Sequence, residues 1–378
     1  MSGATARIPV RVAGREEREY EIRLEPGLRH NLGERCRDAV PAHRYALVSD
    51  SQVARLYGRE LLDSFGVSGY EADLFEFPAG EWNKTRREWA GLSDRLLREG
   101  FGRDSVVVAV GGGVTGDLAG FLAATYMRGI PVIQVPTTLL AMLDSSVGGK
   151  TGVDTERGKN LVGAFHHPAR VFVDVSFLET LPRFQIAAGL AEAVKTAAIL
   201  DAELFEWLER RAADLLTGDP LTLARLIARV VEHKARVVGR DPTESGIRAI
   251  LNFGHTVGHA LELLGGYEIL HGEAIAAGMR SEARLGELLE VTRPGTAARL
   301  EEALAACELD RQLESERPAE EVWRAAETDK KMRGGTIRCV LLHRIGEVAQ
   351  AAAGVFTHEI SPEIAPVWHA ALRSGVER

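Results

Sequence analysis

The chain has 378 residues, 45% hydrophobic and 26% charged, which is the composition of a globular protein long enough for two domains. Its 46 basic and 54 acidic residues give a formal net charge of −8, which argues against non-specific nucleic-acid binding. There is no apolar run of the ~18 residues that span a membrane, no apolar signal core at the N-terminus and no metal-type spacing among the three cysteines. A cytoplasmic protein without a membrane partner is expected.

The first part of the chain alternates short apolar runs with helical segments. Apolar and polar residues alternate over residues 7–24, which predicts a β-hairpin. Strands are predicted at residues 44–50 and 70–77, and amphipathic helices at 51–66 and 86–100. This order is typical of an α/β domain.

The stretch from Ser105 to Thr138 carries the clearest signal of function. The apolar run SVVVAV ends at GGGVTGD, a helix of small residues follows, and a second apolar run ends at Pro136. This pattern predicts a βαβ unit with parallel strands. Gly111, Gly113 and Gly116 form G-x-G-x-x-G at the strand-to-helix turn, where residues without Cβ let the backbone approach a pyrophosphate. We therefore predict a nucleotide or phosphate site there.

One feature departs from the usual dinucleotide fingerprint. The acidic residue expected about 20 positions after the glycines is missing from PVIQVP, and Asp50 or Glu81 could hold the ribose instead. Both follow predicted strands, as do the Gly111 turn and the Thr137-Thr138 pair. Because ligands of doubly wound sheets bind at the carboxyl ends of the strands, these residues are expected to meet on one rim.

After Pro182 the sequence becomes mostly helical. Strand candidates are residues 336–342 and 347–351, and helices are predicted at residues 185–199, 202–215, 219–239, 247–264, 272–290, 295–307 and 317–331. We predict an α/β Rossmann-like NAD-binding domain of residues 1–180 and a mostly α-helical metal- and substrate-binding domain of residues 181–378, with a cleft between them.

The helical part contains a candidate metal site. Glu192 and Lys195 are three residues apart and His255 and His259 four apart, so each pair shares a helix face, and His271 precedes a predicted helix start. Imidazoles with a carboxylate are usual ligands of catalytic Zn²⁺. From spacing alone we predict His255 and His259 as ligands, with Glu192 or His271 as the third. The alternative is that these histidines are ordinary core or surface residues.

Two lysines stand out among the cationic residues. Most lysines and arginines on an acidic chain cover solvated helix faces, but Lys150 and Lys159 fall in SVGGKTG and RGKNLVG, which read as glycine-rich loops. Such loops suit phosphate. Together the patterns predict a dinucleotide, a metal and a phosphorylated anionic substrate in one cleft.

Several long motifs resemble one known family. GGGVTGDLAGFLAATYMRG, QVPTTLLAMLDSSVGGKTGV, GKNLVGAFHHP, GLAEAVKTAAI, LNFGHTVGHALE, LHGEAIAAGM and DKK, in this order from about residue 45 to 350, are similar to the 3-dehydroquinate synthase family. The resemblance implies a Rossmann-like domain with NAD⁺, a helical domain with Zn²⁺ or Co²⁺, and a homodimer. It also implies conversion of 3-deoxy-D-arabino-heptulosonate 7-phosphate to 3-dehydroquinate by transient oxidation, phosphate elimination, re-reduction and aldol cyclisation.

The resemblance also implies roles for individual residues. The metal ligands would be Glu192, His255 and His271, with His259 as a hydrogen-bonding residue instead of a ligand. Cofactor contacts would come from Asp50, Glu81, Lys84, Gly113, Val114, Asp117, Thr137, Thr138, Asp144, Lys150, Lys159, Asn160, Phe177 and Thr180. Substrate and catalytic contacts would come from Arg128, Asp144, Lys150, Asn160, Lys195, Lys234, Arg248, Asn252, His259 and Lys330 or Lys331.

Two departures and three alternatives remain at this point. Pro242 stands where the family commonly has a glutamate, and Gln185 where some members have a cofactor-contacting one. A related sugar-phosphate cyclase, such as an amino-dehydroquinate, inosose or valiolone synthase, is one alternative. A metal-dependent polyol dehydrogenase of the glycerol dehydrogenase type is the second, and a non-catalytic binding module is the third. Arg248, Asn252 and His259 favour a substrate with a carboxylate.

Overall fold

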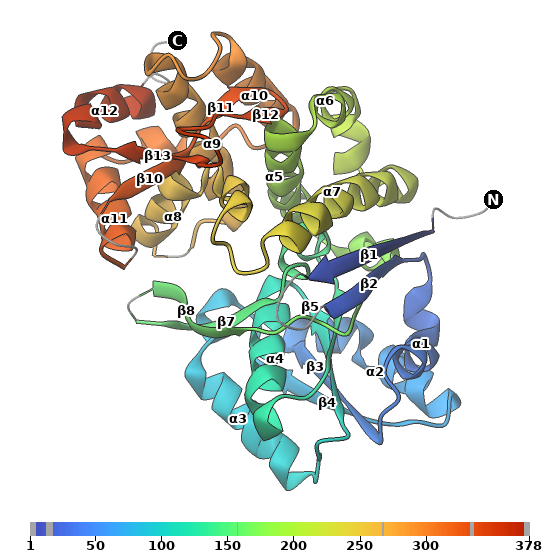
Figure 1. Ribbon diagram of the computed structural model, residues 1–378. Coiled ribbons are helices and arrows are strands. Elements are labelled where there is room, and N and C mark those ends of the chain that lie inside the picture. Colours follow the sequence, from blue (N-terminus) through green and yellow to red (C-terminus); the bar gives the residue numbers. More distant parts are fainter. Residues whose placement is uncertain (1–4, 13–17, 157, 267, 333–335, 374–378) are drawn as a thin grey trace. The chain divides into compact units, whose positions relative to one another are not determined.

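The computed structural model describes residues 5–12, 18–156, 158–266, 268–332 and 336–373 (Figure 1). Internal contacts divide the chain into two compact units. The first unit comprises Met1–Leu181 and Pro220–Pro242, and the second comprises Pro182–Asp219 and Thr243–Arg378. No described helix combines the length and apolar character needed to cross a membrane.

A seven-stranded sheet forms the centre of the first unit. The edge strand β1 pairs antiparallel with β2, as the predicted hairpin requires, and every other pairing in the sheet is parallel. The strand order is β1 (Ala6–Val12), β2 (Arg18–Leu24), β9 (Arg170–Val173), β6 (Val132–Pro136), β5 (Val106–Gly111), β3 (Arg44–Asp50) and β4 (Glu71–Phe77).

Helices cover this sheet because its central strands are apolar on both faces. All six residues of β5 are buried, as expected for a parallel strand between helical layers. The covering helices include α1 (Leu32–Ala39), α2 (Ser51–Val67), α3 (Arg86–Arg98) and α4 (Gly113–Thr125). Helix α4 lies close to β6 because Gly116 has no side chain; a Cβ there would be 2.8 Å from Gln134 Oε1.

Helix α7 (Pro220–Arg240) belongs to the first unit, although the sequence placed it in the second domain. It packs against β1 and against the short π-helical turn Ala141–Ser145. Its buried residues recur at helical spacing, for example Leu223, Ile227 and Val230. That pattern predicts a buried face but not which core buries it. The assignment of cofactor and substrate to separate domains stays a prediction.

The segments around Lys150 and Lys159 are strands and not the loops that their glycines suggested. They form an antiparallel hairpin of β7 (Lys150–Thr155) and β8 (Gly158–Phe165). Glycine is uncommon inside strands, which is why the segment read as loop. Here Gly163 permits close pairing, because a Cβ on it would lie 2.1 Å from Thr151 O.

The second unit is mainly helical, as predicted. Its helices are α5 (Arg183–Leu200), α6 (Ala202–Leu216), α8 (His255–Leu264), α9 (His271–Leu288), α10 (Thr296–Ala306), α11 (Ala319–Met332) and α12 (Ala365–Arg373). Two small sheets accompany them, β10 (Ile337–Val340) with β13 (Thr357–Ile360) and β11 (Leu342–Arg344) with β12 (Glu347–Val348). An apolar core that includes Leu261, Ala277 and Trp368 joins α8, α9 and α12.

The single helix predicted at residues 247–264 is interrupted. A 3₁₀ segment, η6 (Ile247–Asn252), ends before Phe253, and α8 starts after Gly254, which adopts φ 80° at its N-cap. This left-handed conformation is available to glycine at little cost. The break redirects the chain immediately before His255.

Candidate functional site

In the first unit, the carboxyl ends of neighbouring strands meet as the sequence predicted. Asp50 ends β3, and its Oδ2 accepts a hydrogen bond of 3.3 Å from Thr115 Oγ1 on α4. Gly111 ends β5, and its carbonyl accepts from the backbone N–H of Thr137 at 2.9 Å. Asp50, the glycine turn and Thr137 therefore lie on one rim of the sheet.

The N-terminus of α4 is suited to an anion. Gly112 occupies the N-cap without a side chain to cap the helix, so Gly113 and Val114 in the first turn present their N–H groups with the positive end of the helix dipole. Thr138 is close by, since a Cβ on Gly112 would lie 3.1 Å from Thr138 Cγ2.

A charged group beside this rim joins four residues predicted to contact a cofactor. Lys84 is nearly buried, and its Nζ lies 2.6 Å from Asp117 Oδ2 and 3.8 Å from Glu81 Oε1. Lys159 Nζ also lies 3.8 Å from Glu81 Oε1. Burial opposes the charge on Lys84, but Asp117 and Glu81 outweigh it and raise the pKa of the ammonium group. Burial raises the pKa of Asp117.

Asp154, which the sequence analysis missed, organises the same group. Its Oδ1 accepts from the N–H of Asn160 at 2.8 Å, and its own N–H donates to the Lys84 carbonyl at 2.7 Å. Asn160 adopts φ 56°, a left-handed conformation that asparagine adopts more readily than most residues other than glycine. Burial raises the pKa of Asp154 to about 6. The sequence does not reveal this role, because the contact between Asp154 and Asn160 depends on how β7 pairs with β8.

The remaining predicted residues of the first unit occupy different settings. Asp144 pairs with the buried Lys234 of α7. Arg128, in a left-handed conformation with φ 69°, and Lys150 are exposed. The ring of Phe177 is buried and lies edge-on to Tyr57, whose hydroxyl is 2.7 Å from Thr180 Oγ1. Contact of these residues with a cofactor or substrate stays a prediction.

In the second unit, three helices approach one another at glycines. A Cβ on Gly272 would lie 2.0 Å from Ala188 O, so α9 and α5 are in backbone contact. A Cβ on Gly278 would lie 1.8 Å from Gly254 O, so α9 meets the start of α8 equally closely. This packing brings residues of α5, α8 and α9 together although they are far apart in the sequence.

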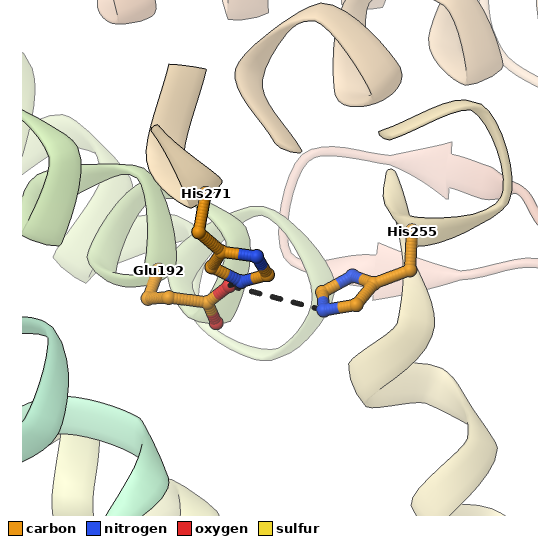
Figure 2. A group of neighbouring side chains, drawn as sticks. All are labelled: Glu192, His255 and His271. Carbon is orange, nitrogen blue, oxygen red and sulfur yellow. Dashed lines mark ion pairs between the residues drawn. The ribbon is translucent and has the colours of Figure 1, made fainter. Parts of the chain in front are cut away.

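The side chains of Glu192, His255 and His271 point toward one another from these helices (Figure 2). Their ligand atoms all lie within 4.8 Å of one another. Glu192 Oε1 is 3.5 Å from His271 Nε2 and 4.0 Å from His255 Nε2. Two imidazole nitrogens and one carboxylate oxygen form a common donor set for a Zn²⁺ ion that keeps a position open for substrate.

The Glu192 carboxylate itself fits a metal. Its side chain is 1% exposed, and neither oxygen receives a hydrogen bond in good geometry within the described residues, although the Lys195 ammonium contacts Oε2. A buried carboxylate is costly unless it is paired or coordinates a metal. Lys195 pairs with Oε2, and the remaining oxygen with the two imidazole nitrogens forms a donor set that fits the metal implied by the resemblance.

The pKa values of Glu192, His255 and His271 depend on one another and on neighbouring charges. Burial would raise the pKa of Glu192, but Lys195 and His271 outweigh it and lower the pKa to about 2. Burial lowers the pKa of His255 well below its usual value, and the neighbouring Lys195 adds to this effect. His255 is thus neutral, as a metal ligand must be. Burial also opposes the charged form of His271, but Glu192 and Glu262 raise its pKa to about 10.

His259 does not belong to this ligand group. It lies one turn further along α8, with its ring centroid 5.1 Å from that of His255 and 6.5 Å from that of His271. The ring of His259 is at least as near to His255 as the ring of His271 is, at 5.6 Å, but the ligand atoms that converge with Glu192 are those of His255 and His271. The pair predicted from spacing alone, His255 with His259, is therefore not the pair that the structure groups with Glu192. The grouped set is the one that the resemblance implies, and its metal binding stays a prediction.

Other predicted residues of the second unit lie around η6 and α5. Lys195 and Arg248 are buried. Asn252 Nδ2 donates to Glu244 Oε1 at 2.6 Å. The segment that has Pro242 where the family commonly has a glutamate therefore still supplies a carboxylate. The backbone of Lys330 and Lys331 belongs to α11, but their side chains lie outside the described part of the chain.

Two buried glutamates were also missed. Glu262 Oε1 lies 3.4 Å from His271 Nδ1, and Glu282 of α9 accepts hydrogen bonds from N–H groups at the start of α8. Glu262 follows His255 by seven residues and His259 by three, so all three share a face of α8. That spacing was visible in the sequence, whereas the contact with His271 was not.

Comparisons with known proteins match nearly the whole chain. Family models described as 3-dehydroquinate synthase N-terminal and 3-dehydroquinate synthase C-terminal match residues 74–188 and 189–332. The chain is 44% identical over 363 residues to the 3-dehydroquinate synthase of Symbiobacterium thermophilum, covering 96% of this chain and 98% of the relative.

Solved structures with ligands are also similar. The 2-epi-5-epi-valiolone synthase of Streptomyces hygroscopicus with NAD⁺ and Zn²⁺ bound has a TM-score of 0.86 and 28% identity, covering 96% of this chain and 98% of that one. A 2-deoxy-scyllo-inosose synthase complexed with carbaglucose-6-phosphate, NAD⁺ and Co²⁺ has a TM-score of 0.86 and 27% identity, covering 98% of this chain and 99% of that one.

Proposed function

The chain belongs to the 3-dehydroquinate synthase family, and we propose from that premise that it converts 3-deoxy-D-arabino-heptulosonate 7-phosphate to 3-dehydroquinate and phosphate. The observation that carries the proposal is the group of Glu192, His255 and His271, in a chain that matches this family along nearly its full length. The reaction combines transient oxidation, phosphate elimination, re-reduction, ring opening and aldol closure.

The proposal includes two cofactors, NAD⁺ and Zn²⁺, with Co²⁺ as an alternative metal. Glu192, His255 and His271 would hold the metal, which supplies Lewis acidity toward substrate hydroxyls. NAD⁺ supplies a reversible two-electron oxidant, and it would be held by the rim of the first unit. There, the N-terminus of α4 suits its pyrophosphate, and Asp50 and Glu81 supply carboxylates for hydroxyl groups.

The proton transfers would be carried by side chains beside the metal ligands. Lys195 is buried against Glu192, and His259 follows His255 by one turn of α8. An ammonium and an imidazole can hold and return the proton of a reacting hydroxyl. The Glu192 carboxylate keeps its charge near neutral pH because its pKa is about 2.

The two acidic groups of the substrate would be bound by different residues. We assign the phosphate to Arg128, Lys150, Asn160 and a lysine of the Lys330–Lys331 pair, because a phosphate needs several donors and positive charge. We assign the carboxylate to Arg248 with Asn252, since a guanidinium group can donate two parallel hydrogen bonds to a carboxylate. Holding both ends of the substrate orients the carbon chain for elimination and ring closure.

We further propose that the protein works as a homodimer in the cytoplasm. Cys36, Cys307 and Cys339 are buried free thiols, which suits a reducing compartment. Light scattering on the purified protein tests the dimer: a monomer mass at working concentrations would contradict it.

Another cyclase of the same fold is the main alternative, because the valiolone and inosose synthases cover nearly the whole chain at 27–28% identity. The identity to the Symbiobacterium 3-dehydroquinate synthase is higher, at 44%. Arg248 and Asn252 additionally favour a substrate with a carboxylate. The amino-dehydroquinate alternative keeps that carboxylate and is separated only by assay.

Product identification tests the proposal. The purified protein with NAD⁺ and Zn²⁺ is given, in parallel, the heptulosonate phosphate, its amino analogue and a hexose 6-phosphate, and products are identified by NMR. We expect 3-dehydroquinate from the first substrate at the highest kcat/KM. A higher kcat/KM with either other substrate would contradict the proposed substrate, and a keto product with net NADH would indicate a dehydrogenase.

A further inference from the structure

The imidazole of His271 lies between two buried carboxylates. Its Nε2 is 3.5 Å from Glu192 Oε1, and its Nδ1 is 3.4 Å from Glu262 Oε1. The side chain of Glu262 is 3% exposed. The two ring nitrogens therefore face different partners, one in the candidate metal site and one outside it.

His255, the other candidate histidine ligand, also has its two ring nitrogens facing different partners, but the acceptor at Nδ1 is weaker. Nδ1 of His255 donates to the backbone carbonyl of Phe253 at 3.2 Å, while its Nε2 faces Glu192 Oε1. Both rings thus direct Nε2 toward the shared carboxylate. The difference is that the acceptor at Nδ1 is a neutral carbonyl for His255 and a carboxylate for His271.

The position of Glu262 follows from the helix that carries it. His255, His259 and Glu262 are spaced four and three residues apart on α8, so they form one face of that helix. His271 begins α9, which packs on this face through Gly258, where a Cβ would lie 3.0 Å from Ala274 O. The close helix contact brings the Glu262 carboxylate to the outer nitrogen of His271.

We infer that Glu262 is a positioning residue that holds His271 for metal binding, an inference that rests on the proposed function. A carboxylate at Nδ1 retains the proton on that nitrogen, so Nε2 is the nitrogen that gives up its proton and binds the metal. It also fixes the plane of the ring and makes the imidazole a stronger donor. One positioning carboxylate on α8 thus orients a ligand on α9.

The competing explanation is that Glu262 only stabilises the packing of α8 on α9. A substitution of Glu282 is a control that disturbs the packing of α8 on α9 without removing a contact to His271. Glu282 is fully buried on α9 and accepts hydrogen bonds from Gly254 N at 2.8 Å and Thr256 N at 3.1 Å, at the start of α8. It therefore joins the same two helices through backbone groups instead of an imidazole.

The experiment compares Glu262→Gln, Glu262→Ala and Glu282→Gln with the wild type. Zn²⁺ affinity is measured by competition with a chromophoric chelator, melting temperature is measured on the metal-free proteins, and the visible spectrum is recorded after Co²⁺ loading. We expect Zn²⁺ affinity to fall about 10–100-fold in Glu262→Ala. We expect a smaller fall in Glu262→Gln, since the amide oxygen still accepts a hydrogen bond, and an altered Co²⁺ spectrum in both.

Glu282→Gln is expected to lower the melting temperature and to lose less Zn²⁺ affinity than Glu262→Ala, because Glu282 holds backbone N–H groups beside His255 and contacts no ligand imidazole. The inference is overturned if Glu262→Ala binds Zn²⁺ as tightly as the wild type. It is also overturned if Glu282→Gln loses the same affinity, because helix packing would then explain both. Failure of the wild-type protein to bind Zn²⁺ would instead remove the metal site on which the proposed function depends.

Discussion

Replacing Gly278 by alanine tests whether helix contact builds the metal site. A Cβ at this position of α9 would lie 1.8 Å from Gly254 O and 2.9 Å from Gly258 N, whereas ordinary contacts begin near 3.4 Å. Both neighbours are backbone atoms and cannot rotate away. In an interior packed this closely, α8 and α9 must separate by more than about 1 Å.

Such a shift is large for a metal site. His255 follows Gly254 directly, and His271 is on the helix that would move. Because metal–ligand distances hold within about ±0.2 Å, we expect Zn²⁺ affinity to fall at least about tenfold. Overpacking costs about 1–3 kcal/mol, and the higher helix propensity of alanine offsets about 1 kcal/mol of it. The free energy of unfolding should therefore fall by up to about 2 kcal/mol.

The assay measures Zn²⁺ affinity by chelator competition and the free energy of unfolding in denaturant. Gly91→Ala on α3 is the control, since its new Cβ meets no atom within 4 Å. We expect this control to gain up to about 1 kcal/mol of stability and to keep its metal affinity. Wild-type metal affinity and stability in Gly278→Ala would refute the reasoning.

Three further predictions concern the same site. His271→Ala should lose Zn²⁺ and almost all activity because one of three protein ligands is gone; equilibrium dialysis and turnover check this, and full metal content with full activity would contradict it. Arg248→Ala should weaken substrate binding by about 2–5 kcal/mol, since the substrate carboxylate loses its partner; steady-state kinetics would disprove this if KM and kcat were both unchanged. Because Glu192 and Glu262 overcome burial and raise the pKa of His271 to about 10, metal must displace a proton at neutral pH. Zn²⁺ affinity should then rise about tenfold per pH unit up to the pKa of about 10 and level off above it. A flat profile below that pH in chelator competition would argue against a protonated His271.

Much of the first unit could be predicted because its signals are local. The strands β3, β5 and β6 are continuous apolar runs, and the residues that follow such strands meet at one edge of a parallel sheet. Asp50 and Thr137 were placed in this way without any three-dimensional information.

Long-range packing was not predictable from the same patterns. The apolar face of α7 shows that the helix is buried, but its position in the first unit depends on contacts with β1, which lies about 200 residues earlier. The β7–β8 hairpin was read as loops because its glycines serve close strand pairing, which a local pattern does not reveal.

The candidate metal site illustrates the same limit. Spacing identifies residues on one helix face, and it therefore favoured His259, which is on α8 with His255. Glu192 and His271 come from α5 and α9, and they reach His255 only because Gly272 and Gly278 allow those helices to touch. The family resemblance implied this set, while spacing alone left it open. The Glu262 contact required the structure.

The proposed cyclase activity can be tested by following phosphate release and NADH absorbance in one reaction of the purified protein with the heptulosonate phosphate, NAD⁺ and Zn²⁺. We predict phosphate release over many turnovers with no net NADH, because the electrons taken from the substrate return to it within each turnover. Accumulation of NADH in step with substrate consumption would contradict the account, as would no phosphate release from protein that holds both NAD⁺ and metal.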